Sequence, residues 1–219
     1  CRFCFRRHVL DTPVDQDELQ DAFRVRMAAD SDITEVILSG GDPLVLSDRV
    51  LASWLELFNG YSRLRRVRIH TRGPVFTPAR ITPKFTAVVA ASRHPVVIVL
   101  HVNHPDELDA ETAAALARLR SACVLLLSQT VLLAGINDSA DTLAVLFERA
   151  VECGLAPYYL HQLDRVAGAA HFEVAKSRGL EIMRELHRRL PGYMVPRYVE
   201  EVPGDTSKRP IVPGGTPCP

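Results

Sequence analysis

Two cysteines open the sequence with two residues between them, and two arginines follow closely. The run Cys1-Arg2-Phe3-Cys4-Phe5-Arg6-Arg7 is a Cys-x-x-Cys pair in a basic and aromatic stretch. Such a pair serves as a zinc half-site, as a redox dithiol, or as part of the ligand set of an iron–sulfur cluster. A structural zinc site needs a second ligand pair at suitable spacing, and a redox pair needs a small βαβ context. The sequence shows neither, but the pair alone does not choose among the three.

Lys208 is a second candidate, in the polar segment 204–209. A lysine in a polar loop is usually only solvated, whereas a desolvated lysine can bond covalently to the aldehyde of pyridoxal phosphate (PLP). Asp164 and Glu201 follow two late apolar runs. Surface carboxylates are the default interpretation, but two that face one pocket would suit a substrate ammonium group.

Gly40, Gly41 and Asp42 lie between an apolar run and an amphipathic segment. Glycines at such a point let the backbone approach a ligand closely, although a plain tight turn has the same composition. The eight histidines show no metal-ligand spacing, and we interpret most of them as structural or exposed.

Short apolar runs alternate with longer amphipathic segments, a pattern that predicts β–α units and a parallel sheet. Most runs lack alternation, as expected for strands covered on both faces. We predict strands over 35–38, 66–71, 96–102, 123–127, 157–161 and 194–199. We predict helices over 16–29, 47–58, 106–121, 139–153 and 173–190, and little regular structure in the tail 203–219.

Polar residues follow these predicted strands one after another. Ser39 to Asp42 follow the first strand, His70 to Arg72 close the second, and similar groups end the other four. The sites of β/α barrels are built at the carboxyl ends of their strands. This repetition favours a barrel-like enzyme over an open doubly wound sheet.

Composition excludes several classes of protein. Lys plus Arg and Asp plus Glu each number 26, so the net charge is zero and offers no general attraction to nucleic acid or to anionic membranes. No apolar run is long enough to span a bilayer and no signal peptide is visible, so we expect a cytoplasmic location. Five cysteines without a secretory signal argue against a disulfide scaffold.

Taken together, the motifs resemble the lysine 2,3-aminomutase family of radical S-adenosylmethionine (SAM) enzymes, and most of all the branch that makes β-lysine for modifying elongation factor P. Eight segments carry the resemblance in order: CRFCFRRH, VILSGGDPL, RIHTRGPVFTPARIT, VNHPDEL, LLLSQTVLLAGIND, PYYLHQLDRVAGAAHF, GYMVPRYV and GDTSKRPI. The resemblance implies an α/β fold, a partial (β/α)6 radical-SAM barrel over 1–202, and a C-terminal segment over 203–219 that carries the PLP lysine.

The resemblance also implies a cofactor set and the residues that bind it. Cys1 and Cys4 match the second and third cysteines of a Cys-x3-Cys-x2-Cys motif that binds a [4Fe-4S] cluster. Reduction of this cluster cleaves SAM to a radical that takes hydrogen from the substrate. Six residues match positions on the SAM side or facing the cofactors: Gly40, Gly41, Asp42, His70, Arg72 and Gln129.

On the substrate side, Lys208 matches the lysine that holds PLP. Arg6 matches the arginine that pairs with the substrate carboxylate, a natural bidentate use of a guanidinium. Asp164 and Glu201 match the two acids that bind the distal ammonium of lysine. Two acids would repel a side-chain carboxylate, so a relative that acts on glutamate should not keep both.

The sequence departs from the family pattern in two places. It begins at the second cluster cysteine, so the first cysteine and the first barrel strand are expected upstream; we expect this truncated chain by itself to bind a cluster poorly. Ser139 stands where some relatives have a zinc-binding cysteine, and we predict no structural zinc. The oligomeric state stays open.

The expected function is therefore conversion of L-α-lysine to β-lysine by 2,3-amino migration, with an electron donor as partner and (R)-β-lysine supplied to elongation factor P modification. One alternative is an aminomutase that makes free β-lysine. Another is a catalytically inactive barrel that only binds a partner, and a third, weaker one is an ordinary PLP enzyme without radical chemistry.

Overall fold

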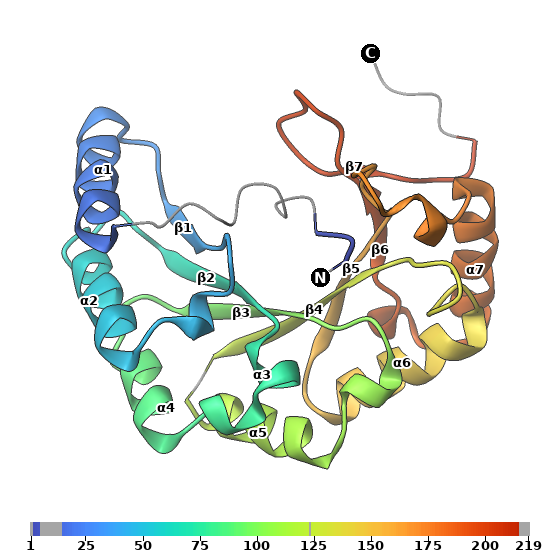
Figure 1. Cartoon of the computed structure of the whole chain (residues 1–219), viewed down its shortest axis with the longest axis horizontal. Helices are drawn as coiled ribbons and strands as arrows, with labels where there is room; N and C mark the ends of the chain where they lie inside the picture. The colour runs from blue at the N-terminus through green and yellow to red at the C-terminus, as the bar shows by residue number, and fades with distance from the viewer. Residues whose placement is uncertain (1, 5–14, 123, 215–219) are drawn as a thin grey trace.

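The computed structural model describes residues 2–4, 15–122 and 124–214 of the chain. Its strands form one sheet in the order β1-β2-β3-β4-β5-β6-β7. The first six strands are parallel, and β7 runs antiparallel to β6. Figure 1 shows a curved sheet whose strands line a concave face, with the longer helices along the outside. The strands are Glu35–Leu38 (β1), Arg66–Thr71 (β2), Val96–His101 (β3), Leu125–Val131 (β4), Ala156–His161 (β5), Arg197–Glu200 (β6) and Arg209–Pro210 (β7).

Helices connect successive strands, and side-chain caps begin most of the longer ones. Ser47, Thr82 and Asp109, for example, each accept a hydrogen bond from a backbone N–H of the first helical turn. None of the helices in the described part of the chain is both long and apolar enough to cross a membrane. The helices are Gln16–Ala29 (α1), Asp48–Asn59 (α2), Gly73–Phe76 (α3), Pro83–Ala90 (α4), Ala110–Ser121 (α5), Ala140–Glu152 (α6) and Lys176–Arg189 (α7).

Five short 3-10 turns complete the connections in the described residues. Three of them, η1, η2 and η3, begin with a proline that fixes the backbone. They are Pro43–Val45 (η1), Pro78–Arg80 (η2), Pro105–Glu107 (η3), Ala170–Phe172 (η4) and Gly192–Met194 (η5).

The main core lies between the sheet and the helices. In β2, Val67 and Ile69 are fully buried on the helix side, whereas Arg68 and His70 alternate with them and are only partly buried. The expectation of strands covered on both faces is therefore wrong for the concave side. Ile37 in β1 and Leu125 in β4 remain 45% and 55% exposed.

The sequence predicted the sheet and most helices correctly, and the differences have local causes. The fourth strand is Leu125–Val131 rather than 123–127, so Ser128 and Gln129 lie inside the strand and not after it. The sixth strand is Arg197–Glu200 rather than 194–199, because a 3-10 turn occupies Gly192–Met194. The helix predicted from residue 106 begins at Ala110, after the turn η3 and the cap Asp109.

Two further elements were not predicted. The short helices α3 and α4 fill the connection between β2 and β3, which the sequence analysis left unassigned. In the tail, where little regular structure was expected, Arg209 and Pro210 pair with β6 as β7. This pairing joins the segment that contains Lys208 to the main sheet.

Candidate functional site at the carboxyl ends of the strands

Parallel pairing places the carboxyl ends of β1 to β6 along one rim of the sheet, where barrel enzymes build their sites. Most of the site residues predicted from the sequence fall within the described part of the chain. They lie at the ends of these strands, directly after them, or next to β7. Cys1 and Arg6 fall outside the described residues. The rim residues are Gly40, Gly41, Asp42, His70, Arg72, Gln129, Asp164, Glu201 and Lys208.

Asp42 joins the loop after β1 to the end of β2. Its carboxylate accepts hydrogen bonds from Leu44 N at 2.9 Å, from Thr71 Oγ1 at 2.6 Å and from Arg72 N at 2.6 Å. Gly40 has φ 128°, a conformation that favours glycine. A Cβ on Gly41 would meet no described atom within 4 Å. The two glycines thus present bare backbone, while Asp42 fixes the loop.

Arg72 pairs with a carboxylate that the sequence analysis did not single out. Its Nη2 lies 2.7 Å from Glu107 Oε1, and the other Glu107 oxygen accepts from Asn103 N at 2.7 Å. The Arg72 guanidinium also lies over the Phe76 ring, 4.4 Å from its centroid. Burial lowers the pKa of Arg72, and the charge of Glu107 opposes that shift. The signal for Glu107 was its place in a short turn after β3, which was predicted as helix.

Two histidines whose Nε2 atoms are buried lie at the centre of the site. Burial is the main cause that lowers the pKa of His101 to about 3 and the pKa of His161 to about 4, so both imidazoles are neutral at pH 7. Each lies within electrostatic range of His70, and the positive charge of Arg72 adds to the shift at His101. Neither Nε2 atom has a hydrogen-bond partner among the described residues. Most histidines were interpreted from the sequence as structural or exposed, and these two were not singled out as site residues; they lie at the ends of β3 and β5.

Gln129 lies beside His101 in the sheet. Its Cα partners are His101 in β3 and Tyr159 in β5, and a β-bulge shifts the register beside it. Gln129 and His101 are both partly buried. The side chain therefore belongs to the same row across the rim.

Lys208 approaches the same row from the carboxyl-terminal side. Its ammonium forms an ion pair with Glu201 and lies 5.9 Å from the centroid of the Tyr159 ring. Lys208 is also the charge that contributes most to the lowered pKa of His161. Burial and the nearby charge of Glu201 raise the pKa of Asp164, while Lys208 opposes the shift. The structure thus brings Asp164, Glu201 and Lys208 together.

Phe3, next to Cys4, also contacts residues at this rim. The Phe3 ring packs edge-on against His101 at 5.8 Å between centroids and against Phe172 at 6.4 Å. The next residue, Cys4, is half-buried and carries a free thiol. Phe3 thus contacts His101, while Lys208 lies within electrostatic range of His161.

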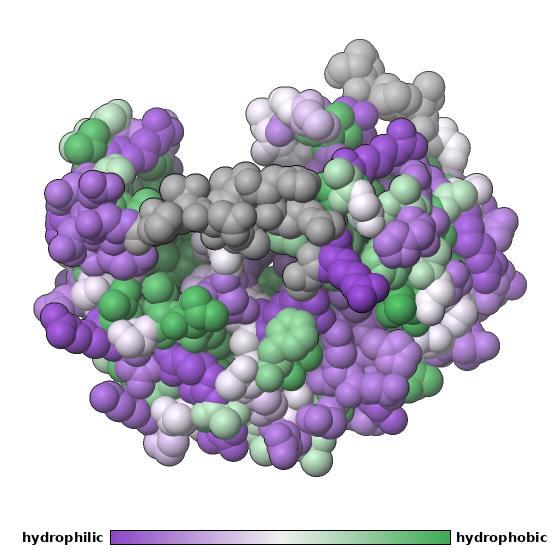
Figure 2. All heavy atoms as spheres, viewed as in Figure 1, coloured by the Kyte–Doolittle hydropathy of each residue, from purple (hydrophilic) through white to green (hydrophobic). Residues whose placement is uncertain are grey.

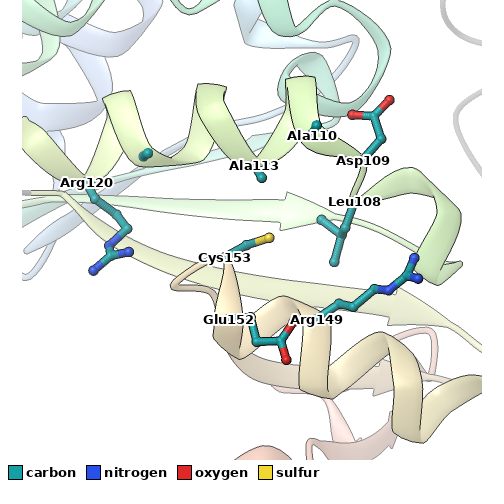
Figure 3. Close-up of a pocket in the computed structure, with 9 residues that line it drawn as sticks. Leu108, Asp109, Ala110, Ala113, Arg120, Arg149, Glu152 and Cys153 are labelled. Carbon is teal, nitrogen blue, oxygen red and sulfur yellow. The ribbon is translucent and has the colours of Figure 1, made fainter.

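A cavity of about 370 Å³ adjoins this region, and Asp164 is part of its wall. Its apolar side belongs to a small cluster in which Leu163 and Ala169 pack with Phe3 and Phe172. A second cavity of similar volume lies between α5 and α6, on the outer side of the sheet (Figure 3). That second cavity contains none of the residues predicted from sequence, so its position gives no support to their roles.

The donor set at the rim fits the cofactors that the sequence predicts. Cys4 offers a thiol for iron, and bare backbone at Gly41 leaves room for a ligand. Lys208 offers an amine, and the two imidazole Nε2 atoms without partners in the described part can hydrogen-bond to a bound group. Residues 2–4, 15–122 and 124–214 contain no group of three or more His, Cys, Asp or Glu side chains placed to hold a metal ion.

Sequence comparison finds that the chain is similar to L-lysine 2,3-aminomutases. The chain is 42% identical over 210 residues to an L-lysine 2,3-aminomutase of Haemophilus influenzae and 41% identical over 213 residues to one of Escherichia coli. These matches cover 95% and 96% of this chain but 62% of each relative. An L-lysine 2,3-aminomutase of Methanococcus maripaludis is 38% identical over 216 residues, 97% of this chain and 49% of that protein. The chain thus spans between about half and under two thirds of these relatives. No family model matches it.

Solved structures of similar fold include a SAM-bound protein and a radical SAM methyltransferase. Streptococcus suis SuiB bound to S-adenosylmethionine superposes with a TM-score of 0.62 at 15% identity, over 92% of this chain and 47% of that one. A radical SAM methyltransferase from Sphaerobacter thermophilus superposes with a TM-score of 0.62 at 18% identity, over 87% of this chain and 59% of that one. The predicted partial barrel is confirmed by this likeness of fold.

Proposed function

This chain is a homologue of the L-lysine 2,3-aminomutases with the partial barrel of radical SAM enzymes, and from that premise we propose that the whole protein converts L-lysine to β-lysine. The reaction moves the α-amino group to the neighbouring carbon. One observation supports this most directly: Lys208, Glu201 and Asp164 gather on the rim that Phe3, the neighbour of Cys4, also contacts.

On the SAM side, we assign cluster ligation to the thiolates of Cys1 and Cys4. A reduced cluster with SAM supplies the one-electron chemistry that removes a hydrogen atom from an unactivated carbon. Asp42 then has a positioning role, because its carboxylate is already used by the ends of β1 and β2. Arg72, His70 and Gln129 line the same side of the site, with Gly40 and Gly41 leaving backbone accessible.

On the substrate side, we assign PLP binding to Lys208. PLP supplies a conjugated system that spreads an unpaired electron while the amino group migrates. The ammonium of Lys208 is paired with Glu201, so its Nζ must lose a proton and leave this carboxylate before it can bond to an aldehyde. Glu201 is thereby released for the distal ammonium of the substrate.

Asp164 completes the acidic pocket, and Arg6 is assigned to the substrate carboxylate. Because Glu201 raises the pKa of Asp164 and Lys208 lowers it, an ammonium placed between the acids favours both ionised carboxylates. We further propose that the product is (R)-β-lysine for modification of elongation factor P, and that an electron donor reduces the cluster. The sequence likeness to that branch supports this, and chiral analysis of the product tests it.

The decisive experiment uses the whole protein, reconstituted anaerobically with iron, sulfide and PLP. We expect a brown protein that forms β-lysine only with lysine, SAM and a reductant together. Cys4→Ser should remove the brown absorbance, and Lys208→Ala should remove the PLP absorbance while keeping the iron. Lys84→Ala, an exposed lysine on α4, is the matched control and should change neither. Lysine turnover without SAM or reductant would indicate ordinary PLP chemistry, and a colourless protein would indicate an inactive barrel.

A further inference from the structure

Two loops carry the proposed ligands for PLP and for the substrate ammonium. The first runs from Gln162 to Val174, between β5 and α7, and contains Asp164. The second runs from Glu201 to Lys208, between β6 and β7, and contains Glu201 and Lys208 at its ends. Their relative position decides whether the acids and the amine can act on one substrate.

Gln162 closes the first loop at its base. Its side chain is almost fully buried, and its Nε2 donates to the Val174 carbonyl at 2.9 Å, which joins the start of the loop to its end. Its backbone N–H donates to the Val199 carbonyl in β6 at 2.7 Å. Its remaining side-chain atom, Oε1, accepts the hydroxyl hydrogen of Tyr198. Both polar atoms of the side-chain amide, and the backbone N–H, thus help to fix the loop to its surroundings.

Tyr198 also closes the second loop. Its backbone carbonyl accepts a hydrogen bond from Ile211 N at 2.9 Å, directly after β7. The neighbouring pairs, Val199 with Pro210 and Glu200 with Arg209, hold Lys208 at the end of this short ladder. One residue therefore fixes the Lys208 segment through its backbone and the Asp164 loop through its hydroxyl.

Gly179 on α7 provides the space for this hydroxyl. A Cβ at Gly179 would overlap the Oη and Cζ atoms of Tyr198. Glycine makes a helix interior less stable than alanine does, and α7 nevertheless has glycine at the point where Tyr198 reaches Gln162. The buried pair is therefore built into the packing of the helix against the sheet.

From these contacts we infer that Tyr198 and Gln162 form a clasp, a pair of positioning residues that sets Asp164 relative to Glu201 and Lys208. The inference rests on the proposed function for its link to lysine binding. Neither side chain touches the reacting atoms; each acts through the two loops that the clasp closes.

Tyr198→Phe in the whole protein tests the clasp, because it keeps the ring and removes only the hydroxyl. Hydrogen exchange should speed up about tenfold in peptides covering 163–173, with peptides from α2 unchanged. The KM for lysine should rise about three- to tenfold, with kcat changed by less than about twofold. Tyr193→Phe removes a hydroxyl from an exposed tyrosine in η5 and is the matched control, with no effect expected.

The double variant Tyr198→Phe/Gln162→Leu separates positioning from stability. Removing one partner of a buried hydrogen bond leaves the other partner unsatisfied. Removing both partners avoids that penalty, so the double variant should recover part of the stability that the single variant loses. The Val174 carbonyl still loses its donor, so exchange in 163–173 and the KM should stay raised. If hydrogen exchange in 163–173 and the KM for lysine both returned to wild-type values together with stability, the clasp would not be a positioning device.

Two other results have definite meanings. Unchanged exchange in 163–173, or equal acceleration in α2, overturns the inference, because the hydroxyl would then have no local role. Faster exchange in 163–173 with an unchanged KM supports the clasp but contradicts the proposed role of Asp164 in binding lysine. Failure of the inference and failure of the proposed function are thus distinguishable.

Discussion

Among single side chains, His161 has a marked effect on how stability depends on pH. Burial lowers its folded-state pKa to about 4, and the charges of Lys208 and His70 add to this while Glu201 opposes it. The unfolded chain takes up this proton near the ordinary value of about 6.5. The folded state binds the proton only at lower pH, so acid favours unfolding. Stability from this group is complete above about pH 6.5 and is lost as pH falls towards 4.

We therefore predict that His161→Gln reduces the loss of folding stability between pH 7 and pH 4. In urea unfolding of the chain without cofactors, the wild type should lose on the order of 2–3 kcal/mol more than the variant between pH 7 and pH 4. His101 is present in both proteins, and burial and Arg72 lower its pKa more than His161 does, so most of the difference comes from His161. Parallel pH curves for the two proteins would contradict the neutral, buried imidazole.

We predict that Asp42 contributes to the folding stability of the chain even when no cofactor is bound. Its carboxylate accepts three hydrogen bonds across two strand ends, and Asp42→Ala leaves those donors without this acceptor. We expect a loss of about 1–3 kcal/mol in the free energy of unfolding, measured as a lower melting temperature. Asp32→Ala, an exposed aspartate before β1, is the control and should fall within about 0.5 kcal/mol of wild type.

Turning to helices, Ser139 has a structural role at the position where some relatives have a zinc-binding cysteine. Its hydroxyl accepts from Thr142 N at 3.1 Å and begins α6. We predict that Ser139→Ala costs about 1 kcal/mol of stability, measured by chemical denaturation. Ser139→Thr, which can still cap, should recover most of that loss; equal effects of the two substitutions would show that the hydroxyl does not cap the helix.

Gly179→Ala sets helix propensity against packing. Alanine alone would favour α7 by about 1 kcal/mol, but its Cβ would overlap Tyr198, and overpacking costs about 1–3 kcal/mol. We expect net destabilisation in thermal unfolding, with a smaller effect when Tyr198→Phe is already present. Gly192→Ala is the control, since a Cβ there meets no described atom within 4 Å. A Gly179→Ala protein more stable than wild type would show that the contact relaxes freely.

The sequence was informative about elements whose pattern is local. β1, β2 and α1 have the predicted limits, since apolar runs and caps are visible in a single stretch of chain. Gln129 was placed after a strand because its polarity suggested a loop; in the structure β4 continues through it, and the partly open concave face accepts polar side chains. Periodicity cannot show which face of a strand is open.

Contacts between distant segments were not predictable from spacing. Glu107 pairs with Arg72, and Gln162 meets Tyr198, only because neighbouring strands end at the same level. The resemblance supplied Asp164, Glu201 and Lys208 as a set, and their proximity in the structure agrees with it. The roles assigned to all these residues stay predictions, and Cys1 and Arg6 also lie outside the described residues.

As a whole, the chain is expected to unfold in one step. Its main core cluster runs without a break from Met27 in α1 to Tyr198 in β6. The single tryptophan, Trp54, is 7% exposed in α2, near one end of the sheet. We predict that tryptophan fluorescence and far-ultraviolet circular dichroism give the same denaturant midpoint. A separate fluorescence transition would show that the β1 side unfolds independently.

The surface around the site carries hydrophobic side chains as well as charges. Figure 2 shows hydrophobic patches on the face that includes α3. Phe76 in α3 is 66% exposed, and Val45 in η1 is 81% exposed. Single exposed hydrophobic residues are common on protein surfaces, so Val45 and Phe76 do not by themselves indicate a binding partner.

The two edges of the sheet differ, and this affects how the chain behaves in concentrated solution. The β6 edge is covered by β7, which contains Pro210, whereas β1 pairs only with β2 among the described residues and leaves Ile37 45% exposed. An uncovered strand is a template for edge-to-edge aggregation. Preparations of these 219 residues alone should therefore self-associate through β1, and a lysine at position 37, Ile37→Lys, should keep them monodisperse.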